Sequence, residues 1–171
     1  MKKLCTLLTA GILLLLLACM NPVDNSSRLM DKQRCRFELP AELSLKKIDT
    51  ALFSKEGYFK IEPIEDAGLM QIFVFNKQTN PDDHISAQQA ALNSPEVFTA
   101  NTISHIKHWG KYDGKGLVMD GVYKGGIIKG KITVFAYSTD KSSFLIIRQD
   151  VGSHESVKAD FDRVENSFTL K

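Results

Sequence analysis

The segment from residue 112 to residue 151 alternates between apolar and polar side chains, and no other feature constrains the fold as strongly. A period of two is typical of β-strands that bury one face. Three runs follow this pattern, at 115–123, 127–137 and 144–151, and short segments rich in glycine or polar residues separate them. Such segments favour tight turns between antiparallel neighbours. The sequence therefore predicts three successive antiparallel strands.

Shorter strands are predicted nearer the N-terminus. Residues 35–39 alternate between apolar and polar side chains, and Pro40 ends the run. Residues 58–63 also favour a strand, and residues 69–75 are rich in β-branched and aromatic side chains that suit a well-buried one. The segment 41–56 is ambiguous, although its apolar residues suggest a second extended piece.

A helix is predicted in the middle of the chain. Ser94-Pro95-Glu96 supplies an N-cap, a proline for the first helical position and an acid for the first turn. We expect this helix to run to about His108 and to stop before Gly110. A short helical segment is expected before it, at 85–93, whereas Asn80-Pro81-Asp82-Asp83 is typical of a turn or loop.

The C-terminal segment predicts a closing helix. Four apolar residues recur at a helical spacing and form one stripe: Val157, Phe161, Val164 and Phe168. Two helices with one apolar stripe each can cover the faces of an alternating sheet. The predicted fold class is therefore α+β, an antiparallel β-sheet with two main helices packed on it, in a single globular domain over 34–171.

This order of elements resembles the Mog1/PsbP/DcrB-like fold, an α/β/α sandwich in which a central antiparallel sheet carries helices. The resemblance covers about residues 34–170. It rests on the early strand ending in Leu39-Pro40, on the late three-stranded segment, and on a final helix closing in Val164-Glu165-Asn166-Ser167-Phe168. Some bacterial members of this family are envelope lipoproteins. Its members share no catalytic residues, so none can be transferred to this chain.

The N-terminus resembles that of an exported protein. Met1-Lys2-Lys3 is followed by an apolar run at 4–17, which is shorter than the roughly 20 residues of a membrane-spanning helix but suits a signal peptide. The run ends in Leu16-Leu17-Ala18-Cys19, which resembles the lipobox of bacterial lipoprotein precursors, although Leu17 is bulkier than the usual residue there. The resemblance implies a diacylglyceryl group on the Cys19 thiol and cleavage before it.

We therefore expect three parts: a signal peptide at 1–18, a lipidated Cys19 with a flexible tether up to residue 33, and the domain from residue 34. The tether is expected because residues 20–33 are polar and rich in residues that break secondary structure. Two alternatives remain for the N-terminus: an ordinary secretory signal in which Cys19 has no role, and an uncleaved anchor.

Charge and cysteine content narrow the possible partners. The whole chain has 22 basic and 20 acidic residues, but Lys2 and Lys3 lie in the expected signal peptide, so the mature protein is neutral. A neutral domain has no electrostatic reason to bind nucleic acid. With Cys5 removed and Cys19 acylated, Cys35 has no partner for an intramolecular disulfide. We expect Cys35 to be buried and inert, the alternative being a reactive or intermolecularly paired thiol.

Two histidines are candidate metal ligands. His105 and His108 are three residues apart on the predicted helix, so both side chains can face one ion. Further ligands are candidates only by residue type: Asp82, Asp83, His84 and His154. The sequence has no nucleotide-binding glycine motif, serine nucleophile elbow or cysteine pair for zinc. We therefore expect no catalytic residues, no metal and no cofactor, with both histidines exposed on their helix.

The region from 107 to 131 is locally basic. Its lysines can present a weakly cationic face to anionic lipid headgroups or to an acidic partner, or they can be solvated residues that protect strand edges. They are Lys107, Lys111, Lys115, Lys124, Lys129 and Lys131. Trp109, Tyr123 and Lys124 are the candidate partner-binding residues, and an exposed apolar patch near Trp109 or Tyr123 is the expected contact.

These features predict an envelope lipoprotein, anchored by lipid to a bacterial membrane, whose domain is a non-enzymatic binding or assembly module with an envelope protein as a possible partner. The alternative is an adaptor or immunity-type protein that masks one protein partner. A metal-binding protein or hydrolase is a third, weaker reading. Met20 follows Cys19, and the choice between inner and outer membrane stays open.

Overall fold

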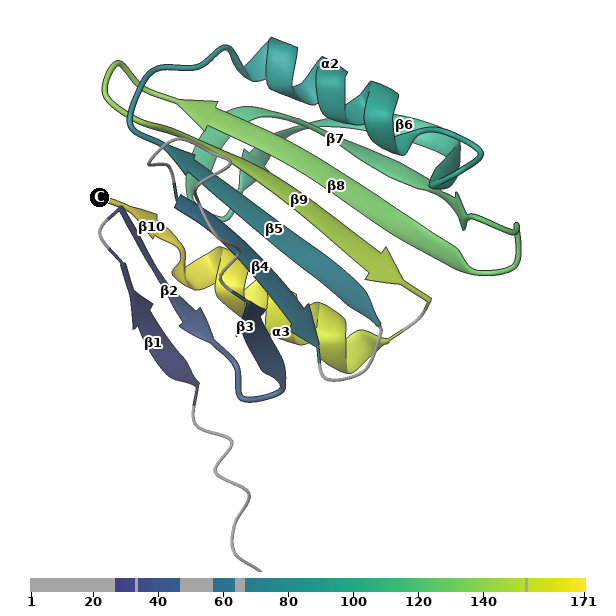
Figure 1. Ribbon diagram of the computed structural model, residues 1–171, viewed down its shortest axis with the longest axis horizontal. Helices are drawn as coiled ribbons and strands as arrows, with labels where there is room; N and C mark the ends of the chain where they lie inside the picture. Colours follow the sequence, from purple (N-terminus) through teal and green to yellow (C-terminus); the bar gives the residue numbers. More distant parts are fainter. Residues whose placement is uncertain (1–26, 33, 47–56, 64–66, 153) are drawn as a thin grey trace, which may run out of the picture.

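The computed structural model describes residues 27–32, 34–46, 57–63, 67–152 and 154–171 (Figure 1). In this part of the chain, two antiparallel sheets combine with two helices. The elements are β1 (Arg28–Asp31), β2 (Cys35–Leu39), β3 (Leu43–Lys46), β4 (Gly57–Pro63), β5 (Gly68–Phe75), α2 (Pro81–Leu92), β6 (Phe98–Trp109), β7 (Tyr112–Tyr123), β8 (Lys129–Ser138), β9 (Ser143–Val151), α3 (Glu155–Ser167) and β10 (Thr169–Leu170).

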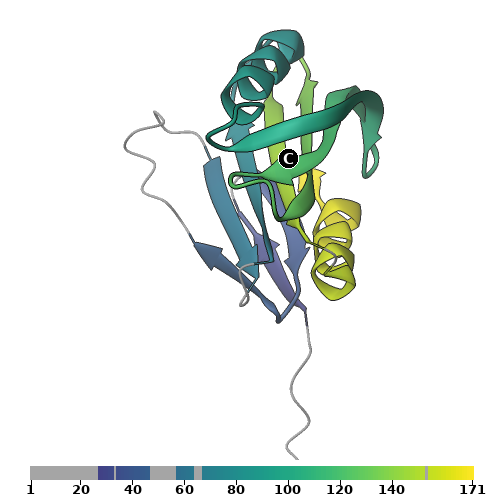
Figure 2. The ribbon, with the colours of Figure 1, turned by 90° about the vertical axis from the view of Figure 1, so that its right-hand side faces the viewer.

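The large sheet has seven strands in the order β3-β4-β5-β9-β8-β7-β6, and the small sheet has the order β1-β2-β10. Helix α2 covers one face of the large sheet, over β7 and β8, while α3 and the small sheet cover the other face (Figures 1 and 2). Each face has its own apolar core. The core on the α2 side includes Ile85, Phe98 and Leu145, and the core on the α3 side includes Phe37, Phe144 and Phe161. The fold is thus the predicted α+β sandwich.

Strands β6 and β7 bend toward the α3 side of the large sheet (Figure 2). Their pairing shifts register twice, between Ala100 and Thr102 and between Ile106 and His108, and such bulges increase the local twist. A Cβ on Gly116 of β7 would lie 2.6 Å from a carbonyl oxygen of β8 and 2.9 Å from the Ile106 side chain. Glycine is therefore the residue that lets β6 fold this closely over β7.

The helix predicted over 94–108 is wrong, because residues 98–109 form strand β6. This strand pairs antiparallel with β7 along its length, from Phe98 opposite Tyr123 to Trp109 opposite Tyr112. Ser94-Pro95-Glu96 forms a turn in which the Ser94 carbonyl accepts hydrogen bonds from the Val97 and Phe98 backbone amides, at 3.0 and 2.8 Å. A strand ladder thus satisfies the backbone groups that the predicted helix would have paired internally.

A capping motif of the same kind does begin a helix, but fourteen residues earlier, at α2. Asn80 is the N-cap and its Oδ1 accepts a hydrogen bond from the Asp82 backbone amide at 3.1 Å, while Pro81 begins the helix. The predicted turn at 80–83 is therefore the first turn of α2. The short helix expected at 85–93 is confirmed, with an earlier start.

The remaining predicted elements are confirmed. The strand at 35–39 buries its alternate residues, the strands at 58–63 and 69–75 correspond to β4 and β5, and the three late strands are β7, β8 and β9. The closing helix is α3, which buries Phe161 and Val164. The extended piece suggested within 41–56 is β3; the other residues of that segment from 47 on lie outside the described residues.

The tether was predicted to reach residue 33, which is too far along the chain. Arg28–Asp31 forms β1, which pairs with all but the first residue of β2, so this stretch belongs to the folded part. The signal peptide and Cys19 lie outside the described residues. Neither α2 nor α3 is long and apolar enough to cross a membrane.

Candidate functional site

A groove of about 240 Å³ runs between helix α3 and the bent strands β6 and β7. We call it the α3–β6 groove. Strands β7, β8 and β9 form its floor and α3 forms one wall. Its residues are Ile106, His108, Trp109, Val118, Lys131, Thr133, Arg148, Asp150, Lys158, Asp162 and Glu165.

Arg148 is the charged residue at the centre of the groove, and only 5% of its surface is exposed. Its Nε donates to both carboxylate oxygens of Asp150, at 2.9 and 3.1 Å, and one terminal nitrogen donates to Asp162 at 2.6 Å. The same nitrogen lies 3.6 Å from a Glu165 carboxylate oxygen, and the other donates to the Lys158 carbonyl at 3.3 Å. This network fastens β9 to α3, because a buried guanidinium needs such partners.

The network shifts the pKa values of its members in opposite directions. Burial tends to lower the pKa of Arg148, but the Asp150 and Asp162 carboxylates outweigh burial and raise it. Burial tends to raise the pKa of Asp162, but hydrogen bonds from Arg148 and Lys158 outweigh burial and lower it. Glu165 differs: burial raises its pKa even though the Gly110 amide donates to its carboxylate.

Trp109, the last residue of β6, closes one end of the groove and is 2% exposed. Its ring packs against Phe135, Phe144 and Phe168, with centroid separations of 6.3, 5.8 and 5.4 Å. Its indole N–H has no hydrogen-bond partner among the described residues. The expectation that Trp109 marks an exposed partner-binding patch is therefore wrong; its role is in the core.

The other two predicted partner residues lie at the far end of the same sheet. Tyr123 is half-buried against Phe98, with ring centroids 5.0 Å apart, and its pKa is raised by burial. Lys124 is exposed and its Nζ lies 2.9 Å from a Glu96 carboxylate oxygen. The structure thus separates Lys124 and Tyr123 from Trp109 by the length of β7.

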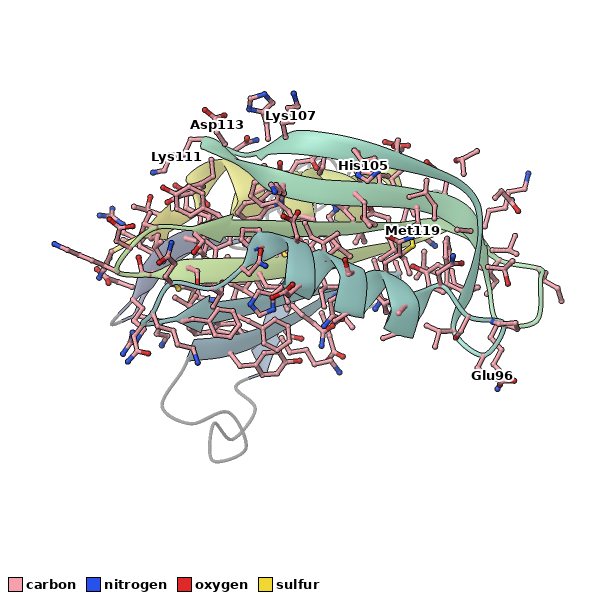
Figure 3. All side chains as sticks on the ribbon, turned by 90° about the horizontal axis from the view of Figure 1, so that it is seen from above. Glu96, His105, Lys107, Lys111, Asp113 and Met119 are labelled. Carbon is pink, nitrogen blue, oxygen red and sulfur yellow. The ribbon has the colours of Figure 1, made fainter. Side chains whose placement is uncertain are left out.

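The predicted metal candidates are dispersed. His105 and His108 lie on strand β6 instead of a helix, and His108 Nδ1 is 2.5 Å from an Asp113 oxygen in the exposed β6–β7 hairpin, where Lys107 and Asp113 point away from the sheet (Figure 3). Asp82 pairs with Lys115 at 2.6 Å, and the His84 ring stacks on Phe75. Among the described residues, no three His, Cys, Asp or Glu side chains gather closely enough to hold a metal ion.

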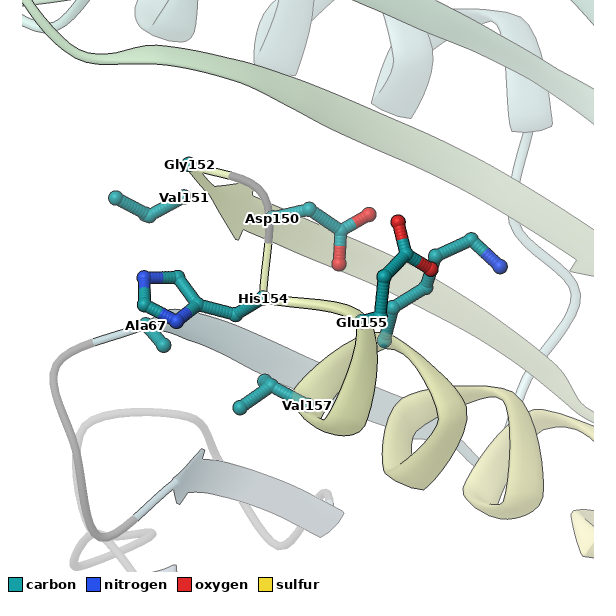
Figure 4. Close-up of a pocket in the computed structure, with 8 residues that line it drawn as sticks. Ala67, Asp150, Val151, Gly152, His154, Glu155 and Val157 are labelled. Carbon is teal, nitrogen blue, oxygen red and sulfur yellow. The ribbon is translucent and has the colours of Figure 1, made fainter.

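His154 lines a second, smaller pocket of about 50 Å³ where β9 leads into α3 (Figure 4). Ala67, Val151, Gly152 and Val157 are among its neighbours there. Sites for metabolites usually measure ~300 to 1,000 Å³. This pocket is far below that range, whereas the α3–β6 groove, at about 240 Å³, comes close to its lower limit and is the stronger candidate.

The basic region is less cationic than its sequence suggests. Lys115, Lys124 and Lys131 face Asp82, Glu96 and Asp120 at 2.6, 2.9 and 3.6 Å. The Lys111 ammonium donates to the Thr169 hydroxyl at 2.8 Å. These exposed pairs leave only a small net positive charge over β6 to β8.

The groove was not found from the sequence, but one signal pointed to it. Arg148 interrupts the apolar run Phe144-Leu145-Ile146-Ile147, and a charge within a buried strand requires partners from another element. The sequence could not say that Asp162 and Glu165 of α3 would supply them, because their approach depends on how the helix packs on the sheet.

Cys35 is fully buried at the start of β2, as expected, and burial raises the pKa of its thiol to about 12. A thiol of this kind is protonated at neutral pH and shielded from reagents. We expect a maleimide at pH 7.5 to leave Cys35 unmodified in the folded protein and to modify it fully in 8 M urea. Rapid modification without urea would show that β2 separates readily from the core.

The domain has a PsbP-like α+β fold, and its comparisons with solved structures are the basis for that assignment. No protein-family model matches the chain, and neither does any curated protein. Cyanobacterial PsbP (CyanoP) from Synechocystis sp. PCC 6803 matches with a TM-score of 0.52 and 13% identity, over 90% of this chain and 97% of CyanoP.

Two further structures are similar. LpqN of Mycobacterium tuberculosis, described as involved in cell envelope biogenesis, matches with a TM-score of 0.51 and 10% identity, over 85% of this chain and 91% of LpqN. A protein from Bacteroides thetaiotaomicron matches with a TM-score of 0.50 and 14% identity; the match covers 80% of this chain but only 45% of that protein. At these identities the likeness concerns the fold.

Proposed function

We propose that this protein is a lipoprotein of the bacterial envelope, held to a membrane by acyl chains on Cys19, and that its PsbP-like domain is a non-enzymatic binding module. The observation that carries the proposal is the sequence Leu16-Leu17-Ala18-Cys19 at the end of an apolar run too short to span a bilayer. Two or more acyl chains provide a stable anchor, whereas one chain is marginal.

The fold and one structural neighbour support an envelope role. The first described strand, β1, begins at Arg28, nine residues after Cys19, so a lipid anchor would keep the domain close to the membrane surface. LpqN, which has a similar fold, is described as involved in cell envelope biogenesis.

The α3–β6 groove supports binding over catalysis. Its three lysine and arginine side chains are matched by three acidic ones. The Asp150 and Asp162 carboxylates accept hydrogen bonds from Arg148, whereas a carboxylate that acts as a general acid or base must be free to exchange a proton with a substrate. Apolar surface from Ile106 and Val118 lies beside these charges. A groove of this size and mixed character suits a few side chains of a partner protein better than a metabolite.

The anchor is tested by Cys19→Ser in the full-length protein. Without the thiol no diacylglyceryl group can be attached, so we expect loss of lipid labelling and accumulation of the unprocessed precursor. Cys35→Ser is the matched control, because it also removes a thiol but lies in the core, and it should keep normal labelling and processing. Unchanged processing and membrane retention of the Cys19→Ser protein would contradict the proposal.

A further inference from the structure

The β7–β8 hairpin ends in an exposed apolar tip. Ile127 is 88% exposed and Ile128 is 49% exposed, the former more than any other large apolar residue among those described. Val97, 36% exposed, lies next to the start of the turn, because its carbonyl accepts a hydrogen bond from the Lys124 amide at 3.0 Å. We call Val97, Ile127 and Ile128 the apolar tip.

The hairpin holds the tip in a defined shape. The Tyr123 amide donates to the Ile128 carbonyl and the Gly126 amide donates to the Tyr123 carbonyl, both at 2.9 Å. Gly125 and Gly126 have φ values of 92° and 72°, which glycine adopts without strain. A Cβ at either glycine would meet no atom within 4 Å, so the turn projects from the body of the domain.

Lysines flank the tip. Lys124 and Lys129 stand at either side of the turn, and Lys124 pairs with Glu96. Lys131 follows, but it lies opposite Asp150 of β9 and 3.6 Å from Asp120. The tip therefore combines exposed apolar side chains with a lysine on each side of its turn. This combination suits the headgroup region of an anionic membrane, where apolar side chains enter the interface and lysines meet lipid phosphates.

The strand order places the apolar tip at the same edge of the domain as the start of β1, the first described strand after Cys19. Strand β1 begins opposite the last residue of β2, and β2 turns directly into β3, which begins opposite the end of β4. The end of β4 lies beside the beginning of β5. The beginning of β5 pairs with the end of β9, and the end of β9 pairs with the beginning of β8. The start of β1 and the β7–β8 hairpin therefore lie along the same edge of strand ends, which runs from the lower left of Figure 1, where β1 begins, to the right-hand side, where the hairpin lies.

The chain from Cys19 to Arg28 is short. Even fully extended, this stretch reaches at most about 30 Å, so acyl chains on Cys19 would hold this end of the domain near the bilayer. A few apolar residues bind a membrane weakly on their own, but an anchor on the same molecule raises their effective concentration at the surface.

We propose that the apolar tip enters the headgroup region of the membrane that holds Cys19, so that the domain contacts this membrane at two points, through its lipid and through the β7–β8 hairpin. The inference rests on the proposed lipid anchor. It assigns an orientation: the edge with the tip faces the lipid, and the opposite edge, with the β8–β9 turn, faces away.

The test uses the full mature lipoprotein in vesicles of phosphatidylethanolamine and phosphatidylglycerol. Ile127→Cys carries an environment-sensitive maleimide dye, and Lys141→Cys in the β8–β9 turn at the opposite edge is the matched control. Buried Cys35 does not compete for the dye. Nitroxide-labelled lipids should quench the dye at position 127 several-fold more than at position 141, and less when phosphatidylglycerol is replaced by phosphatidylcholine.

The experiment distinguishes failure of the proposed orientation from failure of the proposed lipid anchor. Equal quenching at both positions, in protein that floats with the vesicles, would overturn the orientation and leave the anchor intact. Protein that does not float with vesicles would overturn both proposals, and Cys19 would then react with the dye itself. A dye at position 127 that is shielded in native envelopes but not on pure lipid vesicles would mean that a protein covers the tip, which also contradicts the proposal.

Discussion

Trp109→Ala is expected to destabilise the domain by about 3 to 5 kcal/mol, the usual cost of removing a buried large aromatic side chain. Trp109 joins the end of β6 to aromatic residues from β8, β9 and the residue after α3. Its replacement leaves a cavity among rings that belong to different elements and that cannot all close in. Urea unfolding followed by far-ultraviolet circular dichroism measures the loss.

Trp109→Phe is the matched control. The indole N–H has no partner among the described residues, so phenylalanine gives up volume and no hydrogen bond to the described part of the chain. We expect a loss of about 1 kcal/mol, typical of a moderate change in core shape. A Trp109→Ala protein as stable as the wild type would contradict the core role of Trp109.

Arg148→Leu is expected to cost about 2 to 4 kcal/mol, somewhat less than the loss of one partner from a fully buried ion pair, because Asp150 and Asp162 keep partial access to water. The substitution leaves the carboxylates of Asp150, Asp162 and Glu165 facing one another across β9 and α3. Arg163→Leu is the matched control on the exposed side of α3, where a surface change should stay within about 0.5 kcal/mol. Equal stability of the two variants would show that the network does not fasten α3.

The same network predicts an acid-sensitive component of stability. The folded protein lowers the pKa of Asp162 below its ordinary value of 3.8. A carboxyl with a lowered folded pKa stabilises fully above its unfolded pKa, and this stabilisation is lost as the pH falls through the folded value. Between pH 5 and pH 2, the Arg148→Leu protein should therefore lose less stability than the wild type does. A parallel decline of the two proteins would argue against Asp162 as the Arg148 partner.

The elements that were predicted correctly are those whose local pattern matches their burial. Strand β2 buries Cys35, Phe37 and Leu39 and exposes the residues between them, so its alternation was visible in the sequence. The last strand and α3 also carry their own signal: β9 buries six consecutive residues from Ser143 on, most of them apolar, and α3 buries Phe161 and Val164 from a single apolar stripe.

Strand β6 was missed because it has no such pattern. It is the edge strand of the large sheet, and most of its residues from Thr99 to His108 are exposed, which leaves almost no alternation to read. Two segments of the chain carry the same helix-capping pattern, Asn80-Pro81-Asp82 and Ser94-Pro95-Glu96. The first begins helix α2, whereas the second forms a turn before β6. Pairing with β7 then decided the outcome, as tertiary contacts commonly override local propensity.

The α3–β6 groove and the apolar tip depend on such long-range placement. Arg148 meets Asp162 only after α3 has packed on β9, and the β7–β8 hairpin shares an edge with β1 only because of the strand order. Residue types alone carry neither fact. The predicted patch at Trp109 was misplaced for the same reason, since nothing local distinguishes a buried tryptophan at a strand end from an exposed one.

Mass spectrometry of the N-terminal peptide of the mature protein, purified from membranes, tests the lipid anchor most directly. We expect a peptide that begins at Cys19 and carries a diacylglyceryl group on the cysteine sulfur. A Cys19 with an unmodified thiol, or a mature chain that begins at another residue, would contradict the anchor and with it the orientation proposed for the domain.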